Sequence, residues 1–505
     1  MKPELTQENK TRILFALILI IAIAVRIWGW PTMISQVNVD EAMTAINAKA
    51  IAETGKDMYG TSLPVYLEAW GAIGQSVMLV YIMAFFIKLF GFSFVSVRLP
   101  MLLISIISII VFYKLVKAIW GNTKLALSAM AFVAICPWHL LQSIWSIDCN
   151  MFPHFMLISV YLLLRGIQGK KWMLYLSMLF FALTMYTYGV SIYIVPFFLL
   201  ICGIYLLVKK KVTVKEFILC IIIYLLFSLP ILTMYFINAF HIETDIHIGP
   251  MTIQYFEANT RTSDMLFFSE NMWETFISNA KSLFQMFFGQ YDSLEWNGTI
   301  YFGTVYHISL FFFFVALVHL ITHKEERNVG TFFMTTWLIL SVILGFIINN
   351  VNINRINILW FPMLFFSIYG IYVVCKESKI WKYIIVGIYI ALFISFNIYL
   401  HTTWLEKIDM SGCFSRRIID GVHYAATLEK DTVYYHNVEN IYVRFQNAID
   451  NTTFEHTDSL EKLSDKLKSK QENEAFVMDG TEIEELNIDL IQYQYKQFGN
   501  TFVIY

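Results

Sequence analysis

Residues 13–30 read ILFALILIIAIAVRIWGW, and residues 38–41 read Asn-Val-Asp-Glu. The first stretch is long enough for a helix that crosses a bilayer, which needs roughly 20 residues. The carboxylates of Asp40 and Glu41 follow shortly after it, at the start of a helix-like stretch over residues 41–53. A carboxylate so close to an apolar surface suits chemistry between a lipid-carried substrate and an acceptor outside the membrane.

The composition indicates an all-α polytopic membrane protein with a polar tail. Of the 505 residues, 57% are hydrophobic and only 15% are charged, whereas a soluble domain carries about 25% charge. Long apolar runs recur to about residue 400 and then stop, which predicts a transmembrane domain over 1–400 and a small domain over 401–505. A net charge of −2 without a basic block gives no sign of a nucleic-acid partner.

Lys and Arg gather in alternate linkers, and such linkers usually lie on the cytoplasmic side. The alternation holds if the short apolar stretch 77–90 is an interfacial helix rather than a crossing. It then predicts a multi-pass protein of the plasma membrane with a cytoplasmic N-terminus and an extracytoplasmic tail. About eleven spans are expected, at residues 13–30, 99–119, 124–141, 151–168, 172–189, 191–208, 216–238, 304–322, 330–349, 357–375 and 381–400.

Three regions outside these spans have patterns of their own. Residues 31–98 are expected to form a long first outer loop with two helices near the membrane surface, and residues 270–290 a surface-lying helix in a second outer loop. In the tail we expect a helix over 416–429. Short alternating runs predict strands at 432–435, at 475–478 and in a pair around Gly499-Asn500, so the tail is a small α/β domain.

Asp40 is the first candidate catalytic residue. A carboxylate there can act as the general base that takes the proton of an acceptor hydroxyl. The alternative is a helix N-cap, which Asp also favours, and the two roles are compatible. Glu41 falls in a first helical turn, where the helix dipole favours a negative charge, and it is expected to be structural or to orient its neighbour and the substrate.

Asp148 and Arg355 fall at predicted outer helix ends. Asp148 has three candidate roles, which are orienting the acceptor, helping to bind a divalent metal and contacting the carrier head group, with an N-cap as the alternative. Arg355 breaks the positive-inside pattern, and a bidentate phosphate contact explains it better than snorkelling to the headgroups. Arg261 in the second outer loop is a weaker candidate of the same kind. Arg26 is expected to be paired or to snorkel outward, because a bare charge within a span is costly.

Aromatic residues gather near the predicted outer face, and Trp138 and Tyr188 are candidates for stacking on a sugar. A belt of interfacial aromatic residues is the commoner explanation. No His or Cys pair has the spacing of a metal site, so no metal-binding residue is assigned and no cofactor is predicted beyond the optional divalent ion.

At these positions the chain resembles the GT-C superfamily of polyprenyl-phosphate-sugar-dependent glycosyltransferases. It is most similar to the bacterial branch related to protein O-mannosyltransferases and to the aminoarabinose transferase of lipid A. The resemblance covers most of residues 10–400. It rests on the order of five stations, which are Val39-Asp40-Glu41, Gly91 to Pro100, Cys136-Pro137-Trp138-His139 running to Asp148, Met185 to Pro196, and Asn354-Arg355 before Phe361-Pro362.

The resemblance implies roles for these residues. Asp40 is similar to the proposed catalytic base, Asp148 to a second active-site acid, and Arg355 to a ligand of the carrier phosphate. Many relatives have a Ser-Arg pattern shortly before the second acid, where this chain has Ile144-Trp145-Ser146. The phosphate site is therefore expected to depend more on Arg355 or Arg261.

The implied activity is inverting transfer of a sugar, a hexose or a pentose, at the outer face of the membrane. The donor would be a polyprenyl-phosphate-linked sugar in the bilayer, and the acceptor a hydroxyl of a protein, a glycolipid or a wall polymer. Two alternatives stay open. One is a polymerase or ligase acting on a lipid-diphosphate-linked glycan, and the other is a transporter or flippase. Internal repeats and helices broken near mid-membrane, which transporters often show, are not evident.

Overall fold

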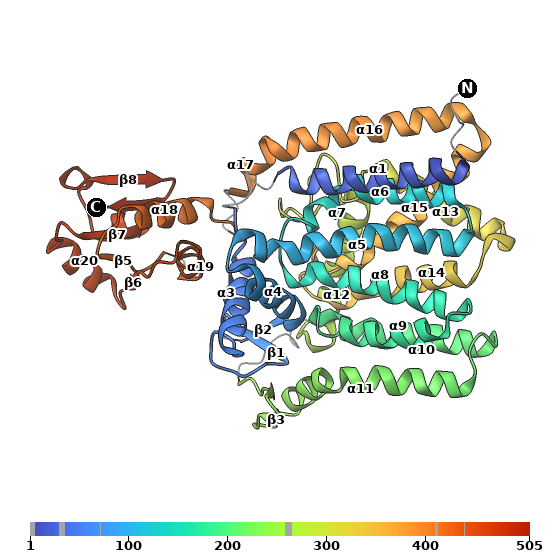
Figure 1. Ribbon diagram of the computed structural model, residues 1–505, viewed down its shortest axis with the longest axis horizontal. Helices are drawn as coiled ribbons and strands as arrows, with labels where there is room; N and C mark the ends of the chain where they lie inside the picture. Colours follow the sequence, from blue (N-terminus) through green and yellow to red (C-terminus); the bar gives the residue numbers. More distant parts are fainter. Residues whose placement is uncertain (1–5, 30–35, 71, 258–264, 410–412, 439) are drawn as a thin grey trace. The chain divides into compact units, whose positions relative to one another are not determined.

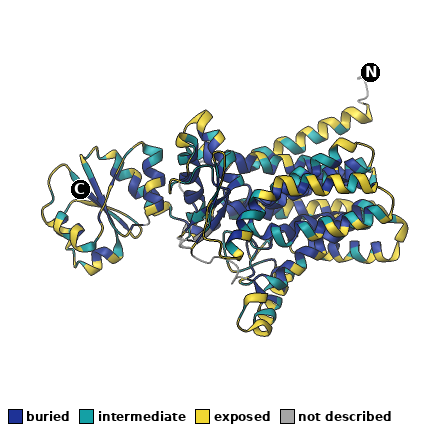
Figure 2. Ribbon diagram, turned by 90° about the horizontal axis from the view of Figure 1, so that it is seen from below, coloured by how far each residue is buried: buried dark blue, intermediate teal, exposed yellow. Residues whose placement is uncertain are grey.

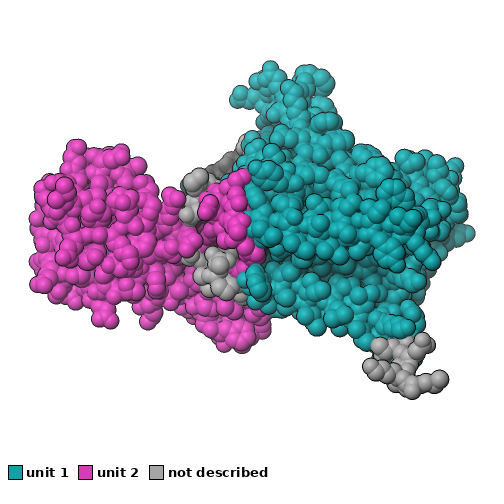
Figure 3. Space-filling view, turned by 90° about the horizontal axis from the view of Figure 1, so that it is seen from above, with its two compact units in different colours: residues 1–28, 59–79, 100–400 teal, residues 29–58, 80–99, 401–505 magenta. Residues whose placement is uncertain are grey.

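A computed structural model describes residues 6–29, 36–70, 72–257, 265–409, 413–438 and 440–505. The chain forms two compact units, coloured separately in Figure 3. Unit 1 comprises Met1–Trp28, Tyr59–Leu79 and Pro100–Leu400, and unit 2 comprises Gly29–Met58, Val80–Leu99 and His401–Tyr505. Segments of the loop that was predicted to lie outside the membrane, for which the name first outer loop is kept, thus belong to the same compact unit as the tail.

Unit 1 is a bundle of apolar helices (Figure 1). Seven helices of the described residues are long and apolar enough to cross a membrane, by length and composition. Six of them are α5 (Phe94–Trp120), α8 (Asp148–Ile167), α11 (Val214–Ala239), α14 (Val329–Ile347), α15 (Trp360–Glu377) with the short η6 (Asn357–Leu359), and α16 (Lys379–His401). The seventh joins η1 (Gly189–Tyr193) to α10 (Val195–Val208).

Each of the eleven predicted spans coincides with a helix. Besides the seven long apolar helices, shorter apolar helices fall at three of the predicted positions. A helix with charged residues near its N-terminal end falls at the first predicted position. They are α6 (Thr123–Ile135), α9 (Lys171–Thr184), α13 (Ser309–Thr322) and α1 (Gln7–Ile27). The multi-pass helical fold is therefore confirmed.

One predicted span is interrupted. Residues 124–141 form α6 and then a separate short helix, α7 (Pro137–Gln142), with Cys136 extended between them. Proline has no N–H for the preceding turn and disfavours a helical conformation in the residue before it, so the helix ends at Ile135.

Helices at the two edges of the bundle have exposed apolar faces. In the apolar stretches of α11 and α16 only 28% and 22% of the residues are buried, and exposed positions run along the outer helices (Figure 2). Exposed Leu226 and Ile398 are examples. A large apolar surface of this kind fits contact with lipid rather than water.

Arg26 lies inside α1 and is 2% exposed. Its guanidinium donates to the carbonyls of Ala22 and Ala134, at 2.8 and 3.1 Å, and lies 2.7 Å from Nδ1 of His139. The expectation that this buried charge is paired is confirmed. These contacts also tie α1 to the end of α6 and to α7.

The first outer loop contains more structure than the sequence predicted. Its two expected helices are α3 (Val39–Thr54) and α4 (Val77–Phe90), the second of which is too short for the usual span. Between them lies a hairpin of β1 (Tyr66–Ala69) and β2 (Ala72–Ser76), which alternation did not reveal.

The second outer loop contains the hairpin β3 (Ile246–Ile248) and β4 (Met251–Ile253), followed by η3 (Leu266–Phe268). The surface helix expected over 270–290 is α12 (Met272–Phe284), continued by the π-helical turn η4 (Gln285–Gly289). Residues 324–326 form a separate short turn, η5 (Lys324–Glu326), in the linker before α14.

The tail of unit 2 starts with α17 (Thr403–Asp409) and continues as an α/β domain with a five-stranded sheet in the order β6-β5-β7-β9-β8. The predicted helix and strands are present as α18 (Arg416–Thr427), β5 (Thr432–Tyr435), β7 (Glu474–Asp479), β8 (Tyr495–Phe498) and β9 (Thr501–Ile504). The sequence did not reveal α19 (Asn440–Asp450), β6 (Glu455–His456), α20 (Leu460–Lys468), α21 (Gly480–Glu485) and η7 (Leu490–Gln492).

Alternation along the strands builds two cores, one on each face of this sheet. Val433, Tyr435 and Val477 pack on the face that α18 and α19 cover, while Tyr434 and Phe476 pack with residues of α20 and α21. Successive side chains of a strand point to opposite faces, so a strand that is apolar at every position must be covered on both. The alternation expected at 432–435 and 475–478 is therefore replaced by burial at nearly every position of β5 and β7.

Candidate active site

The first turn of α3 presents Asp40. Asn38, not Asp40, is the N-cap of this helix, because its Oδ1 accepts the backbone N–H of Asp40 at 2.9 Å. The capping alternative considered for Asp40 therefore belongs to Asn38. The backbone carbonyl of Asp40 accepts the hydroxyl of Thr44 at 2.7 Å, and the Asp40 residue is half-buried. The backbone of Asp40 is thus held in a defined helical turn.

Glu41, the neighbour of Asp40, forms a buried ion pair with Arg98. The Nε and Nη2 atoms of Arg98 donate to the two carboxylate oxygens at 3.1 and 3.0 Å. The side chains of Arg98 and Glu41 are 2% and 1% exposed. Arg98 Nη2 also donates to the carbonyl of Gln36 at 2.6 Å. A two-bond guanidinium–carboxylate pair fixes orientation as well as distance, so Glu41 anchors the turn that carries Asp40.

The segment before α3 is also held by the beginning of the tail. The Val39 N–H donates to the Cys413 carbonyl at 3.1 Å, and the Ser415 N–H donates to the Val37 carbonyl at 3.3 Å. Asn38 and Phe414 form the antiparallel bridge between these bonds. Three separate stretches of unit 2 thus converge on the residues next to Asp40.

Asp148 lies in unit 1 as the first residue of α8, next to Ile147 at the N-cap position. Its Oδ2 accepts the backbone N–H of Ser76 at 3.1 Å, and its Oδ1 accepts that of Cys149 at 2.7 Å. The residue is 9% exposed. Asp148 therefore does more than begin its own helix, because it also ties α8 to the junction of β2 and α4.

A network of neutral side chains connects the start of α8 to the segment that contains Arg355. The amide of Asn357 accepts the indole N–H of Trp138 at 2.6 Å and donates to Oε1 of Gln142 at 3.0 Å. The same Nδ2 lies 3.3 Å from Oδ1 of Asn150 and 3.2 Å from the carbonyl of Cys149. Asn357 thus contacts both residues that follow Asp148, and it lies two residues after Arg355.

Arg355 is partly buried in the turn before η6. Its Nη1 donates to the carbonyl of Asn349 at 2.8 Å, and its backbone N–H donates to Oδ1 of Asn352 at 2.9 Å. The same turn is fixed from the second outer loop, since Oδ2 of Asp292 accepts the N–H of Ile353 at 2.8 Å. Burial raises the pKa of Asp292 above its ordinary value, although the hydrogen bonds that its carboxylate accepts, the one from Ile353 among them, act to lower that pKa.

Trp138 and Tyr188 are both buried. Trp138 is fully enclosed, its indole N–H is bonded to Asn357, and its ring makes an edge contact with Phe361 at 5.1 Å between centroids. The predicted stacking of Trp138 on a sugar is therefore wrong for this structure, because no face of the ring is accessible. Tyr188 is 8% exposed and stands at the N-cap of η1.

The predicted site residues fall into two sets. Asp40 and Glu41 belong to unit 2, whereas Asp148, Arg355, Trp138 and Tyr188 belong to unit 1. Arg261 lies outside the described residues. Among the residues that the structure describes, no group of three His, Cys, Asp or Glu side chains is arranged to hold a metal ion.

The residues Arg98, Asn357, Gln142, Asn150 and Asp292 were missed as functional candidates. A signal was available for Arg98, because it is a cation at a predicted outer helix end, as Arg355 is. The neutral amides gave no signal of this kind, since Asn and Gln at helix ends are common for capping reasons alone.

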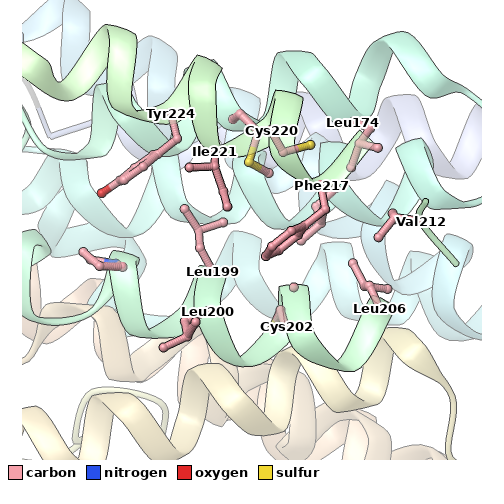
Figure 4. A pocket seen from close by; sticks show the side chains of 14 residues that line it. Leu174, Leu199, Leu200, Cys202, Leu206, Val212, Phe217, Cys220, Ile221 and Tyr224 are labelled. Atoms are coloured by element: carbon pink, nitrogen blue, oxygen red, sulfur yellow. The ribbon is translucent and has the colours of Figure 1, made fainter. Parts of the chain in front are cut away.

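An apolar pocket of about 210 Å³ lies between α8, α9, α10 and α11 in unit 1 (Figure 4). Leu199, Leu206, Phe217 and Ile221 are among its lining residues. The lining contains the hydroxyl of Tyr224 and two buried thiols but no carboxylate and no base. This pocket therefore offers no acid–base chemistry, and its composition is suited to an alkyl or prenyl chain.

The architecture, a multi-pass helical bundle with a long structured first loop and a small terminal sheet domain, is shared with proteins of solved structure. ArnT from Cupriavidus metallidurans, solved bound to undecaprenyl phosphate, superposes with a TM-score of 0.56 at 12% identity, over 99% of this chain and 98% of that chain. Archaeal oligosaccharyltransferase AglB from Archaeoglobus fulgidus, solved with an inhibitory peptide and a dolichol-phosphate, gives 0.53 at 10% identity, over 99% of this chain and 74% of that chain.

At such identities the likeness concerns the fold. The family model of dolichyl-phosphate-mannose-protein mannosyltransferase matches residues 74–235, the stretch from β2 to α11. A search of curated protein sequences gives no match. The resemblance to the GT-C superfamily that the sequence predicted is confirmed by the family model and by the fold.

Proposed function

We propose that the protein is an inverting glycosyltransferase that moves a sugar from a polyprenyl-phosphate carrier to a hydroxyl group outside the membrane. One observation carries the proposal. In a GT-C fold, the Asp40 residue stands in a capped first turn next to the buried ion pair of Glu41 and Arg98. A carboxylate held in a fixed orientation is what a general base requires.

The proposed reaction is a direct displacement of polyprenyl phosphate by the acceptor hydroxyl. The Asp40 carboxylate takes the proton of the acceptor hydroxyl while that oxygen attacks the anomeric carbon from the face opposite the phosphate. The bond between the anomeric carbon and the phosphate oxygen breaks, and polyprenyl phosphate leaves with the electron pair. The configuration at the anomeric carbon inverts in this single displacement.

Arg355 is proposed to stabilise the leaving phosphate. Its position in a turn held by Asn349, Asn352 and Asp292 presents a guanidinium in a fixed backbone frame. A cation aimed at charge that develops on the leaving group lowers the barrier more than one that binds substrate and transition state equally. Asp148 is proposed to orient the acceptor as a second acid, from a helix start that the Ser76 N–H also fixes.

The orientation in the membrane is part of the proposal. Basic linkers such as 165–171 and 209–215 would lie in the cytoplasm, and the tail domain over 401–505 would lie outside. The acceptor would then be a protein, a glycolipid or a wall polymer of the cell envelope. The apolar pocket between α8, α9, α10 and α11 is suited to part of the carrier's prenyl chain.

The test uses the full chain in lipid nanodiscs with a panel of polyprenyl-phosphate sugars and a crude envelope extract as acceptor source. We expect wild type to release polyprenyl phosphate and Asp40→Asn to release it roughly 10² to 10⁴ times more slowly, the usual contribution of one general base. Binding of the carrier lipid should be the same in both proteins. An Asp40→Asn variant with wild-type turnover would contradict the assignment of Asp40 as the general base.

Two further arms separate the alternatives. A donor panel with diphosphate carriers identifies a glycan polymerase or ligase, if release occurs from those carriers alone. Sealed vesicles of right-side-out orientation, with the extract added outside, test the outer-face assignment. Uptake of a lipid-linked sugar without formation of a new bond would support a transporter function and contradict the transferase function.

A further inference from the structure

A polar pocket in unit 2 lies between α3 and the tail domain. Its volume is about 460 Å³, within the range of roughly 300–1,000 Å³ that small-ligand sites occupy. One wall is α3 and the residues that follow it, and the other is the end of β5, helix α19 and residues 452–454. The pocket therefore exists only because the first outer loop and the tail fold together within this unit.

The charges that line this pocket are balanced. Lys49 and Arg444 are basic, while Glu53 and Asp57 are acidic. Lys49 Nζ and Glu53 Oε1 form an ion pair of 2.9 Å along α3. These four charges sum to zero, so the lining has no net charge that would attract a polyanion or a metal cation.

The remaining polar groups are amides and hydroxyls. The Thr452 hydroxyl donates to Oδ1 of Asn447 at 3.1 Å, which holds that amide in place, and Thr453 adds a second hydroxyl to the lining. Tyr435 and Phe454 are buried beside them and supply aromatic surface. Short donors and acceptors of both kinds around an aromatic surface match a ligand with many hydroxyl groups.

A peptide fits this pocket less well. Peptides that bind as an added strand need a free sheet edge, but β5 is paired on one side with β6 and on the other with β7. Peptides that bind as a helix need an apolar groove, whereas charged and hydroxyl side chains are spread over this lining. A saccharide is the class of ligand that remains.

The pocket is physically connected to the proposed base. Helix α3 carries Asp40 in its first turn and Lys49 and Glu53 further along. Lys49 follows Asp40 by nine positions along the helix, a rise of about 13.5 Å. The residues just before Asp40 are bonded to the first residues of the tail domain, so a ligand that bridges α3 and α19 rests on the same framework as the base.

We propose that this pocket binds a neutral or zwitterionic saccharide part of the acceptor, some distance from the hydroxyl that reacts. The proposal rests on the proposed transferase function, since it assigns the acceptor of that reaction. It also gives the tail domain a role, which is to complete a binding site with the helix that carries the base.

The experiment measures binding apart from turnover. The full chain in nanodiscs is applied to a printed array of defined neutral, amino and acidic saccharides and to a parallel array of peptides. The variants are Arg444→Ala and Lys49→Ala, at lining positions on opposite walls of the pocket. Arg444 is exposed and Lys49 is half-buried, so neither side chain belongs to the buried core. The matched control is Lys462→Ala, because Lys462 forms a 2.9 Å ion pair with Asp458 four residues away, as Lys49 does with Glu53.

We expect wild type and Lys462→Ala to bind neutral or zwitterionic saccharides with equal affinity. Both pocket variants should bind them with an affinity lower by a factor of roughly ten or more. A hydrogen bond between a charged group and a ligand is typically worth that factor or more. Binding to peptides or acidic saccharides alone, no binding to either array, or equal binding by all variants would overturn the proposal.

The outcomes also separate this proposal from the proposed function. Asp40→Asn should bind the saccharides as wild type does, because Asp40 does not line the pocket. Saccharide binding by a protein that releases no polyprenyl phosphate from any donor would support the saccharide site and contradict the transferase function. Donor turnover by a protein that binds no saccharide would contradict the saccharide site alone.

Discussion

The two sets of candidate residues are held in place by different physical means. Around Asp40 in unit 2, the anchor is a buried ion pair between Glu41 and Arg98. Around Asp148 and Arg355 in unit 1, the anchor is a neutral network centred on Asn357. Charge fixes the proposed base, and amide hydrogen bonds fix the proposed phosphate and acceptor side.

The difference has an energetic meaning. A buried ion pair is costly to form and very costly to break, because the remaining charge has no compensation. A neutral amide that loses a partner costs only its own desolvation. The side chains that bond to Asn357 are uncharged, so none of them competes with Arg355 for a phosphate.

The largest expected effect follows from breaking the charged anchor. Arg98→Met leaves the Glu41 carboxylate buried without its counter-ion and removes the donor to the Gln36 carbonyl. We expect the free energy of unfolding to fall by about 3–5 kcal/mol, seen as a lower midpoint of thermal unfolding in nanodiscs.

Arg416→Met is the control for this variant. Arg416 and Asp420 form an ion pair of 3.3 Å with side chains that are 49% and 41% exposed. Exposed pairs of this spacing contribute only about 0.3–0.5 kcal/mol, so the midpoint should barely move. Equal shifts in the two variants would mean that burial does not distinguish the two pairs.

A smaller effect is expected from breaking the neutral anchor. Asn357→Ala removes the acceptor of the Trp138 indole N–H and the donor to Gln142. We expect a loss of about 1–3 kcal/mol in the free energy of unfolding, the cost of buried polar groups left without partners. Release of polyprenyl phosphate should also slow, since the turn with Arg355 loses its tie to the start of α8.

Asn397→Ala provides the comparison for Asn357→Ala. The side chain of Asn397 donates to the Phe393 carbonyl within α16 at 2.8 Å, far along the chain from either candidate set. Stability and turnover should change little in that variant. If Asn357→Ala behaves in the same way, the network has no anchoring role.

Much of the fold was predictable from the sequence, because apolar runs and basic linkers report directly on helices in a membrane. Residues 77–90 form a helix of 14 residues, the same length as α9 and α13, so their separation from the membrane-crossing helices stays a prediction from the charge pattern. The break at Pro137 and the hairpin of β1 and β2 were not predicted. An apolar run can continue through a break, and a hairpin of short strands in a long loop has too weak an alternation to stand out.

The candidate site was predictable only in its charged members. Asp40 and Asp148 were identified as carboxylates at predicted outer helix ends, and Arg355 because a cation there breaks the positive-inside pattern. Asn357, Gln142 and Asn150 come from three separate helices and meet only in the folded chain. Trp138 was misjudged for a related reason, since an aromatic residue near a predicted interface has the same pattern whether its ring is exposed or enclosed.

Among the variants of the two anchors, the smallest expected change in stability comes from replacing both partners of the charged anchor, in Glu41→Met with Arg98→Met. Replacing a buried ion pair by apolar side chains of similar volume is often neutral or stabilising, so the unfolding midpoint should return to within about 1 kcal/mol of wild type. Turnover should not return. The Gln36 carbonyl still lacks its donor, the turn with Asp40 has lost a directional contact, and a displacement of about 1 Å at a reacting group can cost a factor of roughly 10². Recovery of stability without recovery of turnover would show that the pair positions Asp40. Recovery of both would reduce the pair to a structural contact and leave the capped turn as the sole anchor of the base.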